Sequence, residues 1–233
     1  MQLQAVPKLD FSRRNETGWL PALDSACREW GCFQLQNHEL GDGLCGSALA
    51  AMERFFALPH TDKLGMERTV DNPWGFYDRE LTKNVRDWKQ IFDIGPESDG
   101  GPFAGARTPW PAQPADFKTI MTTYYEASES LALTLLADIG ECLGVPRGTL
   151  EHEFGDGHSS FLRLNYYPPC ENPGQHLGIS HHTDAGALTV LLPDAQPGLQ
   201  FKRGEQWYTV MPESGSLTIN IGDIIQVWSN DRY

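Results

Sequence analysis

The sequence has 233 residues, of which 40% are hydrophobic, and this is enough to build one or two domains with a buried core. That composition excludes a disordered chain and a small protein held together by disulfides. The 18 Lys and Arg against 31 Asp and Glu give a net charge of −13, which argues against a general nucleic-acid binder and against binding to anionic membranes.

Two helices that flank a strand are predicted at the start of the chain. Apolar residues at three- and four-residue steps predict a helix over Trp19–Trp30 that ends at Gly31, and a short strand over Cys32–Gln36 follows it. A second helical pattern covers residues 44–58 and has to stop there, because Pro59 disfavours the α conformation of the residue before it.

The middle of the chain combines an irregular segment with a long helix. Residues 71–114 are rich in Gly, Pro and Trp, with one strand expected over Trp88–Ile94 and a loop over 95–114, and we expect this segment to cover a site. Residues 115–143 keep helical spacing up to the stop signal at Gly144, which predicts one helix of about 40 Å that supports a sheet.

After Gly157 the period changes from helical to extended. Short runs rich in β-branched and aromatic residues recur about every ten residues, with turn residues between them. Even spacing without helices in between predicts an antiparallel barrel or jelly roll and argues against a parallel α/β sheet. The predicted strands are SSFLRLNYY (159–167), HLGISHH (176–182), ALTVLL (187–192), LQFKR (199–203), QWYTVM (206–211), SLTINI (216–221) and DIIQVW (223–228).

One cluster in this region, Ser180 to Asp184, has the chemistry of a metal site. Alternate side chains of a strand share a face, so His182 and Asp184 can point to one side and chelate one ion, while His181 points to the other. These ligand types suit a 2-His-1-carboxylate triad for Fe(II), whereas zinc is more often enclosed by four ligands. The spacing alone is a weak signal, because most such pairs are simply solvated.

The motifs around this cluster resemble the plant-type non-haem iron, 2-oxoglutarate-dependent dioxygenases. This is the family of flavonoid and gibberellin oxygenases that also contains isopenicillin N synthase, and the resemblance covers nearly the whole chain. The motifs that carry it are VPKLDFS (6–12), ACREWGCFQLQNH (26–38), FFALP (55–59) with Lys63, RLNYYPPC (163–170), GISHHTDAGALTVLL (178–192), GLQF (198–201) and NIGDIIQVWSNDRY (220–233).

The resemblance implies roles for individual residues. His182 and Asp184 would be the first two iron ligands, His181 would not be a ligand, and Asn165 and Tyr167 would contact 2-oxoglutarate. Arg163 shares the alternating strand face of Asn165 and Tyr167, so we also expect it to point inward and meet a carboxylate or a substrate hydroxyl.

The family pattern continues with elements that this sequence does not contain. In the family a third ligand, a histidine, and an Arg-x-Ser pair that binds 2-oxoglutarate follow the stretch at which this sequence ends, at Tyr233. We therefore expect an incomplete domain that lacks the last barrel strands and is inactive as it stands. The remaining histidines lie in segments that the family does not use for iron: His38, His60, His152, His158 and His176.

The resulting fold prediction is an α+β chain with a double-stranded β-helix core, also called a cupin-like jelly roll. We expect an N-terminal helical and mixed region with the cover over residues 1–114, the long supporting helix and a connector over 115–156, and the jelly-roll domain over 157–233.

Several other polar and aromatic residues have alternative interpretations. Phe76 and Tyr77 could stack on an aromatic substrate, but packing of the barrel mouth explains such rings equally well. Residues 87–89 are expected to be structural, with an ion pair between Asp87 and Lys89 and a buried Trp88 ring. Gly222 and Asp223 fit a hairpin turn.

The predicted function is an Fe(II)- and 2-oxoglutarate-dependent dioxygenase that uses O2 to hydroxylate or desaturate a small organic metabolite. An oxidase of the same fold that does not use 2-oxoglutarate, and a non-catalytic remnant that only binds a ligand, are the alternatives. The substrate and the oligomeric state do not follow from the sequence.

A cytoplasmic location is expected from two absences. No apolar run approaches the roughly 20 residues that a membrane helix needs, and the first residues lack the pattern of a secretory signal. The five cysteines form no C-x-x-C pair and are expected to be reduced thiols.

Overall fold

A computed structural model describes residues 5–97, 103–154 and 160–233. These residues form two compact units that interleave along the chain: unit 1 comprises Met1–Cys45, Ala127–Phe154 and Thr183–Tyr233, and unit 2 comprises Gly46–Glu126 and Gly155–His182. His158, the first residues of the predicted jelly-roll domain and residues 98–102 of the predicted loop lie outside the described residues. The three-part division of the chain stays a prediction.

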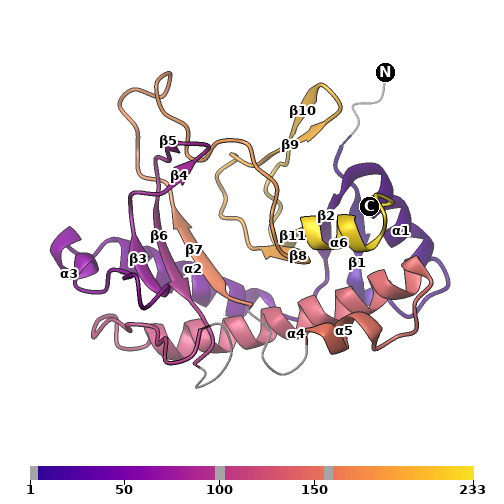
Figure 1. The fold of residues 1–233 in the computed structure, drawn as a ribbon, viewed down its shortest axis with the longest axis horizontal. Coiled ribbons are helices and arrows are strands. Elements are labelled where there is room, and N and C mark those ends of the chain that lie inside the picture. Colours follow the sequence, from indigo (N-terminus) through magenta and orange to yellow (C-terminus); the bar gives the residue numbers. More distant parts are fainter. Residues whose placement is uncertain (1–4, 98–102, 155–159) are drawn as a thin grey trace. The chain divides into compact units, whose positions relative to one another are not determined.

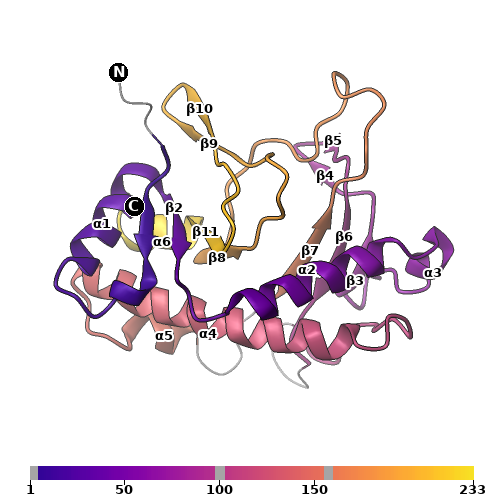
Figure 2. The same ribbon diagram turned by 180° about the vertical axis from the view of Figure 1, so that it is seen from behind.

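Unit 1 is built on a four-stranded sheet. The strand order is β1-β2-β11-β8, with β1 parallel to β2 and the other two pairs antiparallel, and β9 and β10 form a separate hairpin. Figure 2 shows β1 and β2 side by side with α1 next to them. The elements are β1 (Lys8–Asp10), a 3-10 turn (Phe11–Arg13), α1 (Trp19–Trp30), β2 (Cys32–Gln36), α5 (Thr149–Glu153), β8 (Leu188–Leu191), β9 (Gln200–Arg203), β10 (Gln206–Thr209), β11 (Ser216–Ile221) and α6 (Asp223–Trp228).

The N-terminal part of unit 1 forms as the sequence predicts. Helix α1 ends where Gly31 adopts a left-handed conformation with a φ of 65° and its N–H closes the last turn on the Cys27 carbonyl. Strand β2 follows and pairs with β11, which comes from the far end of the sequence. In this pair Phe33 lies opposite Ile219, and Leu35 lies opposite Leu217. These four side chains are fully buried, so burial of both strands drives the pairing.

Unit 2 contains a three-stranded antiparallel sheet with the order β3-β6-β7. Its core is aromatic: the ring centroid of Phe55 lies 4.6 Å from that of Phe92 and 4.9 Å from that of Phe117. The elements are α3 (His60–Leu64), β3 (Gly75–Tyr77), β4 (Leu81–Thr82), β5 (Val85–Arg86), β6 (Gln90–Ile94) and β7 (Leu162–Tyr166).

Two helices contribute residues to both units. Helix α2 (Asp42–Phe56) and the 27-residue helix α4 (Phe117–Leu143) confirm the two longer helical predictions. Figure 1 shows α4 as one continuous helix. Among the residues that the structure describes, no helix is both long and apolar enough to cross a membrane.

Four predictions of local structure are wrong. Residues 223–228 form helix α6 and not the predicted strand, with Gly222 as the N-terminal cap, so Gly222 and Asp223 are not a hairpin turn either. Residues 176–182 contain no strand. Trp88 is 37% exposed, whereas its neighbours Asp87 and Lys89 are buried and form the expected ion pair at 3.3 Å.

The reasons for these errors are physical. The run DIIQVW is too short for its period to separate strand from helix. Residues 176–182 are instead held by isolated contacts, such as the Trp88 N–H donating to the Leu177 carbonyl at 2.9 Å. The Trp88 indole N–H reaches outward to the Pro168 carbonyl at 3.0 Å, and its ring packs beside His176.

The strands that are present are antiparallel in most pairs, as expected. Five of the seven predicted strands after Gly157 correspond to β7, β8, β9, β10 and β11. They lie in separate small sheets, and the closed double-stranded β-helix stays a prediction.

Candidate functional site

The Asp184 carboxylate is fixed by two side chains of the unit 1 sheet. Its Oδ2 atom accepts a hydrogen bond from Thr189 Oγ1 at 2.7 Å and another from Asn220 Nδ2 at 2.7 Å. The backbone carbonyl of Asp184 also accepts from the Asp223 N–H at 2.8 Å. In the structure Asp184 lies in an irregular loop just before β8, and these bonds give its side chain a defined orientation.

The His182 ring has a hydrogen-bond partner that indicates its tautomer. Nδ1 lies 2.9 Å from the Ser180 carbonyl oxygen. Because a carbonyl can only accept, Nδ1 carries the proton, and the lone pair of the neutral ring is then on Nε2. Metal-binding histidines are commonly oriented in this way, with one ring nitrogen on a carbonyl and the other on the metal.

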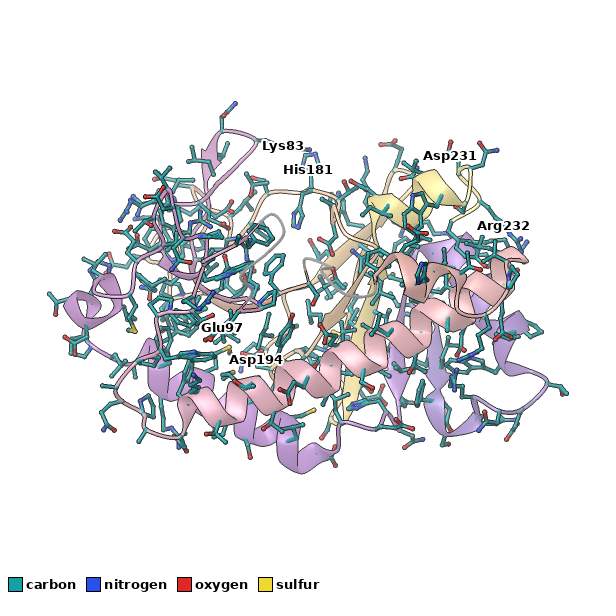
Figure 3. All side chains as sticks on the ribbon, turned by 60° about the horizontal axis from the view of Figure 1, so that its bottom comes forward. Lys83, Glu97, His181, Asp194, Asp231 and Arg232 are labelled. Atoms are coloured by element: carbon teal, nitrogen blue, oxygen red, sulfur yellow. The ribbon has the colours of Figure 1, made fainter. Side chains whose placement is uncertain are left out.

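Alternation of strand faces does not separate His182 from His181 in the folded chain. Residues 181–184 form no strand, so alternation of faces cannot assign the ligand. Both histidines are exposed, and Figure 3 shows His181 on the loop between β7 and β8. For His182 the structure gives a bond from Nδ1 to the Ser180 carbonyl.

An imidazole nitrogen and a carboxylate oxygen are donors that suit Fe(II). Within the described part of the chain, no three His, Cys, Asp or Glu side chains cluster so that they could hold a metal ion. The assignment of His182 and Asp184 as two iron ligands therefore stays a prediction, and their chemistry fits that metal.

Strand β7 carries the residues expected to contact 2-oxoglutarate. Its side chains alternate as predicted: Leu164 is buried in the core and Tyr166 stacks on Phe56 at 5.2 Å, while Arg163 and Asn165 occupy the alternate positions. Tyr167 follows directly after β7; its side chain is half-exposed, and partial desolvation of the phenol raises its pKa, so the hydroxyl stays protonated and can donate a hydrogen bond.

Arg163 is held by carboxylates of unit 2. Its Nε and Nη2 atoms donate to the two oxygens of Asp93 at 2.7 and 2.8 Å, and Nη1 lies 3.3 Å from Glu80. Burial alone would lower the pKa of Arg163, but the bonds to Asp93 and the charges of Asp93 and Glu80 outweigh it and raise the pKa. The carboxylates that Arg163 meets in the folded chain belong to the protein, and its contact with a substrate stays a prediction.

The same carboxylates bind two further cations. Glu80 lies 2.9 Å from Lys89 and 3.3 Å from Arg68. Burial alone would raise the pKa of Glu80, but the hydrogen bond from Lys89 and the charges of Arg163, Lys89 and Arg68 hold it below its ordinary value. This partly buried network was not predicted from the sequence, because its members lie on four separate segments.

The two aromatic candidates differ in their surroundings. Phe76 is 0% exposed and packs in the unit 2 core, so packing explains its position. Tyr77 is half-buried, and the guanidinium carbon of Arg68 lies 3.9 Å from its ring centroid. Contact of either ring with a substrate stays a prediction.

Two family models match the chain. Residues 6–113 match the N-terminal region of the non-haem dioxygenases in morphine synthesis, and residues 158–233 match the 2OG-Fe(II) oxygenase superfamily. The cofactors of that superfamily are Fe(II) and 2-oxoglutarate, with O2 as the usual cosubstrate.

Curated relatives agree with these matches. Jasmonate-induced oxygenase 4 of Arabidopsis thaliana is 35% identical over 92% of this chain and 61% of its own length. Flavanone 3-dioxygenase 2 of Oryza sativa subsp. japonica is 32% identical over 98% of this chain and 66% of its own length. The chain thus spans less than two thirds of either relative.

Solved structures show the same fold. The crystal structure of JOX2 in complex with 2OG, Fe and JA has a TM-score of 0.88 and 29% identity, covering 99% of this chain and 68% of that one. A putative 2OG-Fe(II) oxygenase family protein from Caulobacter crescentus has a TM-score of 0.86 and 25% identity, covering 99% of this chain and 78% of that one.

Proposed function

Because the chain belongs to the 2OG-Fe(II) oxygenase superfamily, we propose that the protein is an Fe(II)- and 2-oxoglutarate-dependent dioxygenase that oxidises a small organic metabolite. The observation that supports this most is that each of two metal donors, two residues apart in the sequence, is oriented by a hydrogen bond. Asp184 has its Oδ2 atom held by Thr189 and Asn220, and His182 has its Nδ1 atom on the Ser180 carbonyl.

Each residue has a distinct proposed role. His182 supplies a neutral nitrogen and Asp184 a negative oxygen, so the two together offset part of the charge of a divalent iron. Asn165 and Tyr167 donate hydrogen bonds to 2-oxoglutarate, whose carboxylates can only accept. Bound iron, with 2-oxoglutarate and O2, supplies the oxidising chemistry.

The substrate class is proposed from the relatives and from the aromatic and cationic residues of unit 2. One relative is named as a flavanone dioxygenase, and one solved neighbour is a complex with 2OG, Fe and JA, so small organic molecules are the proposed substrate class. Arg163, Phe76 and Tyr77 are the candidate substrate contacts. Residues 71–114 are the candidate cover, which would keep water away from the reaction.

Succinate formation tests the proposal. The purified protein is incubated with Fe(II), 2-oxoglutarate, O2 and a panel of flavanones and jasmonates, and succinate and oxidised product are measured by mass spectrometry. For a protein that supplies all three iron ligands, we expect succinate only when both Fe(II) and 2-oxoglutarate are present; the 233 residues by themselves stay predicted to be inactive. Oxidised product without 2-oxoglutarate would favour the oxidase alternative, and ligand binding without any turnover would favour the non-catalytic one.

A further inference from the structure

We propose that Asn220 and Thr189 are positioning residues that orient the Asp184 carboxylate toward Fe(II). This inference rests on the proposed function, because it requires Asp184 to be an iron ligand. Both side chains donate to the same oxygen, Oδ2, each at 2.7 Å. Two donors on one oxygen fix the plane of the carboxylate, and the direction in which Oδ1 points follows from that plane.

The register of the unit 1 sheet places the two donors together. Asn220 of β11 and Thr189 of β8 are directly opposite each other in an antiparallel pair. Side chains of opposed residues lie on the same face, about 4.5–5.5 Å apart at Cβ, so both can reach one atom. A slip of one residue would turn Asn220 to the other face, so the carboxylate orientation depends on this register.

The loop that carries Asp184 is also fixed through its backbone. The N–H of Gly222 donates to Ala187 at 2.9 Å and that of Asp223 donates to Asp184 at 2.8 Å. A Cβ on Gly222 would stand 2.2 Å from the Gly186 carbonyl oxygen and 2.9 Å from that of Asp184, so only glycine allows this approach. The start of α6 therefore holds the loop while Asn220 and Thr189 hold the side chain.

The chemistry of the donors fits a supporting role for a metal ligand. A carboxylate can only accept, so the amide of Asn220 must present its NH2 group, and Thr189 must direct its hydroxyl hydrogen to Oδ2. Hydrogen bonds to a charged acceptor are about twice as strong as neutral ones. Removing such outer partners of a ligand typically weakens metal binding by about 10- to 100-fold.

The test is the dissociation constant for Fe(II) alone, measured anaerobically by isothermal titration calorimetry, together with the melting temperature of the metal-free protein. We expect Asn220→Ala and Thr189→Val each to weaken Fe(II) binding about 10- to 100-fold, and Thr189→Ser to bind like the wild type because it keeps the hydroxyl. Thr189→Val preserves shape, so it separates loss of the hydrogen bond from loss of packing.

Asn37→Ala is the matched control. Asn37 also donates its amide to a carboxylate of unit 1, that of Asp10, at 2.8 Å. This variant loses an equivalent bond and some stability, and we expect its affinity for Fe(II) to stay at the wild-type value. A variant that lowers only the melting temperature would show a structural effect alone.

Asp184→Ala separates failure of this inference from failure of the proposed function. If Asp184→Ala loses Fe(II) while Asn220→Ala and Thr189→Val bind within twofold of the wild type, the positioning role is overturned and the ligand assignment stands. If Asp184→Ala binds Fe(II) as tightly as the wild type, or the wild type binds none, the ligand assignment fails and the positioning role fails with it.

Discussion

The ring of Tyr167 lies directly against Gly178. A Cβ on Gly178 would stand 2.8 Å from Cδ1 and 2.9 Å from Cε1 of the ring, which is closer than side chains pack. The glycine therefore lets the ring keep its present position after the end of β7. This relationship connects a residue of the HLGISHH segment to the proposed 2-oxoglutarate contact.

Replacing Gly178 should weaken the binding of 2-oxoglutarate and leave the fold intact. In Gly178→Ala the exposed ring of Tyr167 has room to swing into solvent, which would remove its hydrogen bond to the cosubstrate. We expect the dissociation constant for 2-oxoglutarate to rise about tenfold or more, because bonds to charged groups contribute roughly 1.5–3 kcal/mol. Titration with Fe(II) present measures this change.

Gly174→Ala is the control for this experiment. Gly174 lies in the same loop, and a Cβ there would meet nothing within 4 Å. We expect its affinity for 2-oxoglutarate to equal that of the wild type. Equal affinities in Gly174→Ala and Gly178→Ala would argue against a role of the Tyr167 position.

A buried carboxylate on α4 should be important for stability. Asp138 is 2% exposed and accepts hydrogen bonds from Arg14 at 2.6 Å and from the Trp19 indole at 2.9 Å. Asp138→Asn removes the charge that pairs with Arg14 and leaves that cation partly buried. We expect the free energy of unfolding, measured by urea titration, to fall by about 3 kcal/mol.

An exposed ion pair provides the comparison. Arg54 and Asp116 are in contact at 2.8 Å, but their side chains are 49% and 51% exposed. Asp116→Asn should therefore change the free energy of unfolding by no more than about 1 kcal/mol. A loss in Asp116→Asn as large as that in Asp138→Asn would contradict the importance of burial.

The Arg163 network allows a further prediction about stability. Arg163→Ala would leave the buried Asp93 carboxylate without its bidentate partner. We expect a loss of about 3 kcal/mol in the free energy of unfolding. An unchanged free energy of unfolding combined with a higher KM for substrate would instead assign Arg163 to substrate binding alone.

Asp24 should make stability depend on pH. Partial burial alone would raise the pKa of Asp24, but the hydrogen bond from Tyr233 and the charges of Arg232 and Arg28 outweigh it and lower the pKa. A lowered folded-state pKa stabilises the protein above the unfolded value of about 3.9, and this contribution is lost as the pH falls through the folded value.

The comparison with Asp24→Asn isolates this contribution. We expect the variant to melt below the wild type at pH 7, and the difference between their melting temperatures to shrink as the pH falls below about 4. If the difference between the two melting temperatures stays constant down to the pH at which the protein unfolds in acid, the charge of Asp24 does not contribute to stability.

Much of the secondary structure could be predicted because it depends on local patterns. Helix α1 and its stop at Gly31, the long helix α4 and strand β7 follow from periodicity and from glycine. The pairing of β2 with β11 could not be predicted, because it joins residues about 180 positions apart and no local pattern encodes a partner. For the same reason the partners of Arg163 were found only in the folded chain.

The candidate site shows the same limit. His182 and Asp184 stand two residues apart and match a family motif, so they could be named from the sequence. Asn220 could not be linked to Asp184, because their contact at 2.7 Å depends on the register of β11 against β8. The strand argument chose His182 over His181 in a segment that is irregular, so it gave no structural support for that choice.

The most direct test of the central claim compares His182→Ala with His181→Ala. The two variants remove the same side chain from adjacent exposed positions, so their effects on folding should be similar. Anaerobic titration with Fe(II) alone gives the dissociation constant for each. We expect His182→Ala to lose Fe(II) binding and His181→Ala to keep the wild-type affinity; loss in His181→Ala with retention in His182→Ala would contradict the assignment of His182 as the ligand.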